Sequence, residues 1–333
     1  MTLRTDGFPA RTVVTAFAIA WVLAIGLAGR TPAASSGGGS PATSASATGD
    51  ARVPPASAGQ ANGFVGDETC TTCHESEGKA LHLTLHGKSQ NERTPSAKAG
   101  QSCETCHGPG QAHVDAGDKT GIKRFAAMSP RDVNATCLTC HTRGSHTEWQ
   151  GSMHDARNLS CTSCHSVHSA VSEKAQLKTV TASQTCEGCH KTEAMKVRRS
   201  GHMPVREGKM DCVTCHNPHG SSNVRMLKVG NSLNETCASC HSEKRGPFLW
   251  EHSAGRENCG SCHDPHGSNN DRMLVAKEPM LCQRCHVSSR HPATIYDGTQ
   301  IAAASNRVVG RSCVNCHSQI HGTNHPAGDK FLR

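Results

Sequence analysis

The sequence is poor in the side chains that ordinarily fill a protein core. Aromatic residues make up 3% of its 333 residues and the apolar fraction is 35%, whereas globular domains run at roughly 45–50%. Between Thr69 and the C-terminus there is no long strand-like alternation, and sustained helical stripes are few. Burial of side chains alone would not offset the entropy of ordering such a chain. The composition therefore excludes an ordinary, self-sufficient hydrophobic core.

The sequence also lacks any cysteine outside one motif. C-x-x-C-H occurs ten times and uses all 20 cysteines, which leaves none for a disulfide, a lipid anchor or a thiol nucleophile. The motif is the attachment site of c-type haem: each thiol adds to one haem vinyl group, and the histidine ligates the iron from one face. A disulfide or zinc scaffold would not require a histidine after every second cysteine.

The motifs predict ten covalently bound c-type haems. The expected attachment residues are Cys70, Cys73, Cys103, Cys106, Cys137, Cys140, Cys161, Cys164, Cys186, Cys189, Cys212, Cys215, Cys237, Cys240, Cys259, Cys262, Cys282, Cys285, Cys313 and Cys316. The expected proximal ligands, which are the histidines of the motifs, are His74, His107, His141, His165, His190, His216, His241, His263, His286 and His317. The predicted fold is a multihaem cytochrome c with a haem core, short helices and loops.

The other histidines recur in a pattern. Every second motif has one histidine before it and another just after it, which gives five dihaem repeats of about 50 residues. These candidate distal ligands, which would bind the opposite faces of the irons, are His86, His113, His154, His168, His202, His219, His252, His266, His291 and His321. Three histidines are surplus to this pattern: His82, His146 and His325. His82 lies on the same helical face as His86 and could compete with it as a ligand. His325 is an alternative to His321 or His291.

One short stretch, 263-HDPH-266, restricts how these ligands can be used. The two axial positions of an iron lie on opposite faces of a wide ring, three residues span at most about 10 Å, and Pro265 restricts the link further. His266 must therefore reach a haem other than that of His263. The same form recurs as 165-HSVH-168 and 216-HNPH-219. We therefore expect an elongated chain of closely spaced haems.

The N-terminus predicts export. Arg4 and Arg11 precede an apolar run from Thr12 to Gly29, and small residues follow, so residues 1–34 resemble a secretory signal, with an uncleaved anchor as the alternative. Residues 35–63 are rich in Ser, Ala, Gly and Pro and predict a flexible linker. Residues 64–333 form the predicted decahaem domain, with haems 1–5 in about 64–200 and haems 6–10 in about 201–333.

The formal charge of +8 does not indicate a nucleic-acid partner. Ten haems would add about 20 propionate charges and, when oxidised, about ten positive charges at their cores, so the holoprotein would carry about −2. The lysines and arginines are expected to pair with propionates.

Four segments resemble the DmsE/MtrA family of decahaem c-type cytochromes, which includes PioA-like members: 210-MDCVTCHNPHGS-221, 234-NETCASCHSEKRGPFLWEH-252, 282-CQRCH-286 and 311-RSCVNCHSQIHGTNHPAG-328. The resemblance covers roughly residues 64–333, and departs from the family at the long linker, His82 and His146. It implies bis-histidine ligation and a periplasmic electron carrier, associated with the outer membrane, that inserts into a β-barrel porin. It also implies periplasmic donor or acceptor cytochromes and an extracellular multihaem cytochrome as partners, in either metal reduction or iron oxidation.

Two other functions are compatible with a multihaem chain. A reductase of small nitrogen or sulfur oxyanions needs an iron with an open position; all ten motifs end in histidine and candidate distal ligands outnumber the irons, so we expect an electron-transfer protein and not an enzyme. A soluble periplasmic shuttle without a porin is the second alternative. Met153, Met203 and Met273 could ligate iron, but with histidines in excess we expect them to pack.

Overall fold

The computed structural model describes residues 63–90, 99–172, 174–286, 312–326 and 328–332. All of them belong to one compact unit, Pro55–Arg333. The predicted signal at 1–34 and all but the last residue of the predicted linker lie outside the described residues. Within the described ranges, no helix combines the length and the apolar character needed to cross a membrane.

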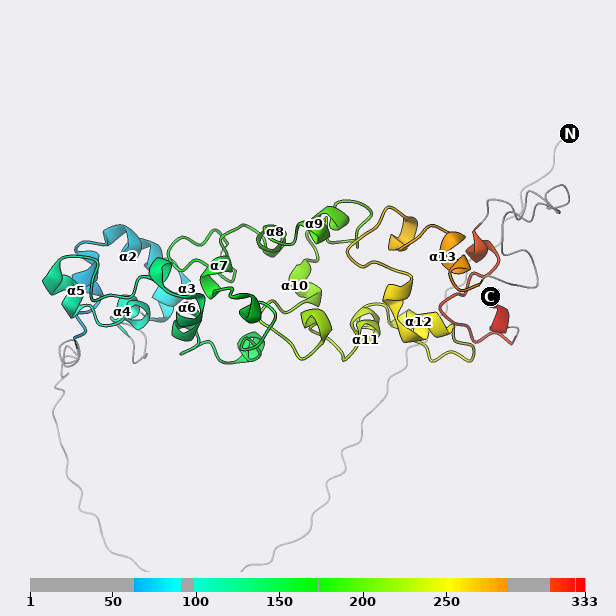
Figure 1. Cartoon of the computed structure of the whole chain (residues 1–333), viewed down its shortest axis with the longest axis horizontal. Helices are drawn as coiled ribbons and strands as arrows, with labels where there is room; N and C mark the ends of the chain where they lie inside the picture. Colours follow the sequence, from blue (N-terminus) through cyan, green and yellow to red (C-terminus); the bar gives the residue numbers. More distant parts are fainter. Residues whose placement is uncertain (1–62, 91–98, 173, 287–311, 327, 333) are drawn as a thin grey trace, which may run out of the picture. The chain divides into compact units, whose positions relative to one another are not determined.

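Short helices joined by irregular segments make up the described chain (Figure 1). The α-helices are α1 (Asp67–Thr71), α2 (Glu75–His82), α3 (Leu85–Ser89), α4 (Ser102–His107), α5 (Gln111–Ala116), α6 (Pro130–Cys137), α7 (Cys161–Cys164), α8 (Ala182–Glu187), α9 (Lys191–Val197), α10 (Cys212–Cys215), α11 (Leu233–Ala238), α12 (Ser253–Glu257) and α13 (Met280–Gln283). Where the chain is described it contains isolated β-bridges but no strand. The prediction of short helices and loops is confirmed.

The haem motifs themselves impose most of these helical turns. In nine of the ten motifs the histidine N–H donates to the carbonyl oxygen of the first cysteine at 2.9–3.1 Å; the remaining motif, Cys103–His107, lies within α4. In such a turn, residues three and four positions apart lie on one face. The two thiols and the imidazole of each motif therefore point to the same side, as attachment to one ring requires.

The motifs pair two by two. In every one of the five predicted repeats, the first cysteine of one motif lies beside the first cysteine of the next, and this contact contributes to a raised pKa of the thiols of Cys103, Cys137, Cys186, Cys237 and Cys282. For Cys103, Cys137 and Cys186 the contact is the largest cause, and for Cys237 and Cys282 burial is larger. The paired motif is thus the structural repeat.

A polar clamp joins the two motifs in three of the repeats. The residue three positions before the first motif accepts a hydrogen bond from the backbone N–H of the first cysteine of the second motif: Asp67 from Cys103 at 2.9 Å, Asn134 from Cys161 at 2.8 Å, and Asn234 from Cys259 at 2.8 Å. The acceptors sit in α1, α6 and α11. The residue that joins the two motifs therefore lies in the same helix as the first cysteine of the first motif.

We expect Asn134→Ala to destabilise the holoprotein by about 1–3 kcal/mol, because Asn134 is 4% exposed and its loss leaves buried polar groups without partners. Its amide also donates to the Leu159 carbonyl oxygen at 3.0 Å. Guanidinium-induced unfolding measures the change. Asn231→Ala, at an exposed position, is the matched control and should change stability by no more than about 0.5 kcal/mol. Equal effects of the two substitutions would contradict the clamp.

The polypeptide packs little apolar surface on itself. Among the described residues, the buried apolar side chains are Leu81, Val133, Trp149, Ala194, Leu227 and Leu274. Such a small set agrees with the composition and leaves the folding of the chain dependent on apolar surface supplied by its cofactors.

Candidate haem sites

Nine of the ten proximal histidines face a second imidazole. The ring centroids lie 5.8–6.2 Å apart in the pairs His74–His113, His107–His168, His141–His86, His165–His219, His190–His154, His216–His266, His241–His202, His263–His321 and His286–His252. The tenth proximal histidine is His317, and His291, the candidate nearest to it in the repeat pattern, lies outside the described residues.

This spacing fits a metal held between the two rings. Metal–imidazole bonds of about 2 Å on opposite sides of one iron place the ring centres roughly 6 Å apart. Direct contact between two imidazoles would bring them closer, as it does for His146 and His219, whose tilted ring centroids lie 4.3 Å apart. The residues present at these nine pairs therefore fit a c-type haem.

The second imidazole comes from another repeat wherever a neighbouring repeat exists. A histidine that follows one even-numbered motif faces the proximal histidine of the previous even-numbered motif. His266, after the eighth motif, faces His216 of the sixth, with ring centroids 6.1 Å apart. A histidine that precedes an even-numbered motif faces the proximal histidine of the next odd-numbered motif. His202, before the sixth motif, faces His241 of the seventh, with ring centroids 6.0 Å apart. The exception is the first repeat, where His113 faces His74 of the same repeat. His266 therefore faces a ring other than that of its neighbour His263.

Backbone carbonyls orient many of these imidazoles. Nδ1–H donates to a carbonyl oxygen in His107 (Lys123, 2.8 Å), His165 (Ala175, 2.6 Å), His216 (Arg225, 2.9 Å), His263 (Arg272, 2.9 Å) and His154 (Pro218, 2.7 Å). His113 donates to the Asp118 carbonyl oxygen and His86 to Gln176 Oε1 at 2.6 Å. A donor at Nδ1 leaves Nε2 as the free lone pair, which is the atom an iron would take.

Burial keeps several of these imidazoles in their neutral form. It lowers the pKa of His219 to about 4, with smaller contributions from His146 and His165. It is also the largest cause of the lowered pKa of His107, His141, His252, His266 and His321. Only the neutral imidazole ligates a metal, so the fold favours the ligating state at neutral pH.

A glycine directly after the second histidine allows that histidine to approach. Gly267 has φ +123°, and a Cβ there would lie 2.4 Å from the Lys196 carbonyl oxygen. Gly220 has φ +118°, and a Cβ there would lie 2.1 Å from the Glu148 carbonyl oxygen. Only glycine tolerates both the positive φ and the contact, so each turn can lie directly against the backbone of an earlier segment.

The surplus histidines have different surroundings. His146, which the sequence left without a role, contacts His141 at 5.3 Å and His219 at 4.3 Å and so lies between two candidate sites. His82 is exposed at the end of α2, while His86 is the one that faces His141. Met153 and Met203 are 57% and 72% exposed. All 20 cysteines are in the described ranges, and none forms a disulfide.

The helical turns, paired thiols and facing imidazoles define a multihaem c-type cytochrome. The family model described as a doubled CXXCH motif matches residues 154–195, 202–246 and 252–291. Each match joins an even-numbered motif to the next odd-numbered one, so its pairs are offset by one motif from the pairs that the thiol contacts make. The chain thus binds haem c through its C-x-x-C-H motifs.

The chain belongs to the MtrA family of multihaem electron-transfer cytochromes, which confirms the resemblance seen in its motifs. It is 42% identical to the multiheme cytochrome MtrA of Shewanella baltica over 277 residues, which cover 80% of this chain and 81% of that protein. It is 27% identical to the cytochrome c-type protein NrfB of Escherichia coli over 138 residues, 37% of this chain and 65% of NrfB. It is 24% identical to the C-type polyheme cytochrome OmcB of Geobacter sulfurreducens over 213 residues, 54% of this chain and 25% of OmcB.

Proposed function

We propose that this chain carries ten bis-histidine c-type haems and conducts electrons across the outer membrane inside a β-barrel porin. The observation that carries the proposal is the second imidazole opposite nine of the ten proximal histidines. Membership of the MtrA family and the resemblance of the motifs support the porin and a location in the periplasm at the outer membrane.

Each pair of facing imidazoles is proposed to ligate one iron. For His317 we propose His291, the histidine that precedes the same motif in the repeat pattern; His325 is the alternative. The 20 cysteines hold the ring edges, and the Nδ1 contacts to backbone carbonyls hold the imidazole planes. In this proposal residues 1–34 direct export, 35–63 are a linker and 64–333 bind the haems.

Filling both axial positions favours a carrier over a reductase. When bound, c-type haems supply reversible one-electron chemistry between ferric and ferrous iron. In this proposal the histidines of the nine pairs fill both axial positions and leave no open position for a small substrate. These features support transfer of electrons between partner cytochromes, outward to metals or inward from iron.

Physical chemistry requires a protein sheath if such a chain crosses a membrane. The hydrocarbon core of a bilayer is about 30 Å thick, and irregular polar backbone cannot face lipid because its hydrogen-bonding groups would have no partners. A closed β-barrel satisfies its own backbone and is the sheath available in an outer membrane. The short helices and loops of this chain would then line the inside of the barrel.

Reconstitution in liposomes tests the proposal. With the cognate porin, the cytochrome should let an external reductant reduce a dye enclosed in the vesicle, whereas the porin alone or the cytochrome alone should not. The measurement is dye absorbance against time. Dye reduction that is equal without the porin, or absent when both are present, would favour the soluble shuttle instead.

A further inference from the structure

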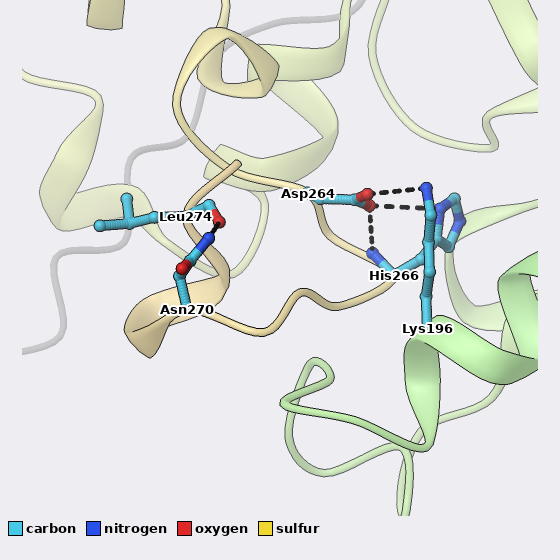
Figure 2. Close-up of polar contacts among 5 residues, drawn as sticks. All are labelled: Lys196, Asp264, His266, Asn270 and Leu274. Atoms are coloured by element: carbon cyan, nitrogen blue, oxygen red, sulfur yellow. Dashed lines mark hydrogen bonds and ion pairs between the residues drawn. The ribbon is translucent and has the colours of Figure 1, made fainter. Parts of the chain in front are cut away.

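Two turns, after the sixth and the eighth motif, have nearly the same geometry. His216 and His263 each donate from Nδ1 to a carbonyl oxygen nine residues later, Arg225 and Arg272, at 2.9 Å. Asn223 and Asn270 donate to the carbonyl oxygens of Leu227 at 3.0 Å and Leu274 at 2.8 Å, the second of which is drawn in Figure 2. One turn is therefore an internal reference for the other.

The two turns differ in charge at one position, Asn217 in the first and Asp264 in the second. Each side-chain oxygen accepts from the backbone N–H of the histidine two residues later: Asn217 from His219 at 3.2 Å and Asp264 from His266 at 3.1 Å. Since the neutral asparagine supports the same turn, the negative charge of Asp264 is not needed to form it.

The segments against which the two turns pack also differ in charge, and the difference is complementary to that between Asp264 and Asn217. Lys196, whose carbonyl oxygen lies against Gly267, donates from Nζ to Asp264 Oδ2 at 2.8 Å, and the two side chains are 36% and 22% exposed. The equivalent residue opposite Gly220 is Glu148, which would repel an aspartate at 217. Asn217 instead donates to the Ser145 carbonyl oxygen at 2.9 Å. The aspartate and the lysine therefore occur together at the turn after the eighth motif, and both are missing from the turn after the sixth.

The charge difference reaches the imidazole that faces the neighbouring site. Asp264 Oδ1 lies 3.7 Å from Nδ1 of His266, and the same carboxylate group also contacts Lys196 (Figure 2). In the reference turn, His219 Nδ1 is buried, and nothing among the described residues accepts a hydrogen bond from it. Two imidazoles in matched turns thus differ in whether a carboxylate faces Nδ1.

We propose that Asp264 and Lys196 set the reduction potential of the haem held between His216 and His266, with Asp264 lowering the potential and Lys196 limiting that effect. The inference rests on the axial pairing proposed above. A carboxylate near Nδ1 makes the imidazole a stronger donor to iron and favours the ferric state. Lys196 offsets part of the negative charge, because its ammonium lies against the other carboxylate oxygen.

Asp264→Asn gives this turn the residue of its reference copy while Lys196 remains. It should raise the potential of one haem, changing its equilibrium constant for one-electron reduction by on the order of tenfold, which is about 59 mV. Lys196→Met should shift the same haem in the opposite direction. Potentiometric titration of the holoprotein, followed by the electron paramagnetic resonance of the low-spin ferric haems, measures both shifts. His266→Met identifies which low-spin signal belongs to the haem between His216 and His266, because that signal is lost in this variant.

Asp271→Asn is the control, since it removes an exposed carboxylate of the same turn. It should leave the reduction potential of the haem between His216 and His266 unchanged. A shift in Asp264→Asn equal to that in Asp271→Asn would overturn the inference, as would shifts of the same sign in Asp264→Asn and Lys196→Met. A high-spin signal in Asp264→Asn would mean that Asp264 only positions the ring, and would also overturn it. If His266→Met removed no low-spin signal, the axial pairing itself would be wrong and the inference would lose its basis.

Discussion

His266→Met is expected to change the haem attached beside His216 and to leave the haem beside His263 six-coordinate and low-spin. His266 faces His216, with ring centroids 6.1 Å apart, whereas His263 faces His321 at 6.1 Å. Replacing an axial imidazole by a thioether raises a haem potential, or leaves the iron five-coordinate and high-spin if the methionine does not reach it. Either result is a large change in one haem, visible by low-temperature magnetic circular dichroism and in a redox titration.

The matched control for this prediction is His82→Met. His82 is exposed at the end of α2 and His86 takes the position opposite His141, so every haem should keep its spectrum in this variant. To tell which iron changed in His266→Met, the substitution is combined with His321→Met. Two separate haems should then be altered. A single altered haem in the double variant would mean that His266 and His321 serve the same iron, contrary to the pairing.

The double variant Cys212→Ser/Cys215→Ser is expected to carry nine haems where the unmodified holoprotein carries ten. Ten complete motifs consume every cysteine, and serine forms no thioether with a vinyl group. Intact mass under denaturing conditions measures both numbers. The variant should also lose several kcal/mol of stability, since a missing ring removes far more apolar contact than the large-to-small substitutions that cost about 2–5 kcal/mol.

Val213→Ala is the control for haem loss, because it changes the same motif without touching a thiol and should retain ten haems. Eight or nine haems in the unmodified protein would show that at least one of the motifs is not used. An unchanged haem count in the double serine variant would show that this motif carries no covalent haem in the unmodified protein.

The sequence was sufficient for features that local spacing determines. Cys259, Cys262 and His263 occupy one helical turn whatever surrounds them, so attachment chemistry follows from the motif alone. The repeat pattern also selected histidines such as His202 and His266 that the structure places opposite proximal rings. Short helices followed from a composition with too few apolar side chains for longer packed elements.

Other features depend on contacts distant in sequence and left no local signature. Nothing in 263-HDPH-266 indicates that His266 faces His216 and not another ring, because that choice is made by packing against α9. The acceptors that orient the imidazoles are mostly backbone carbonyls, such as those of Arg225 and Arg272, and any residue type supplies one. The pairing of Lys196 with Asp264 is equally invisible until both segments are placed.

The exchange of imidazoles between repeats makes the molecule modular in length. An internal repeat gives one histidine to the even motif of the repeat before it and another to the odd motif of the repeat after it, and it receives one histidine from each of these two repeats. Duplication of such a repeat would preserve every pairing, so a longer series of haem sites requires no redesign of its neighbours. The first repeat, where His113 faces His74, closes on itself instead. Removal of that repeat would take His86 from its place opposite His141 and would leave His168 without His107.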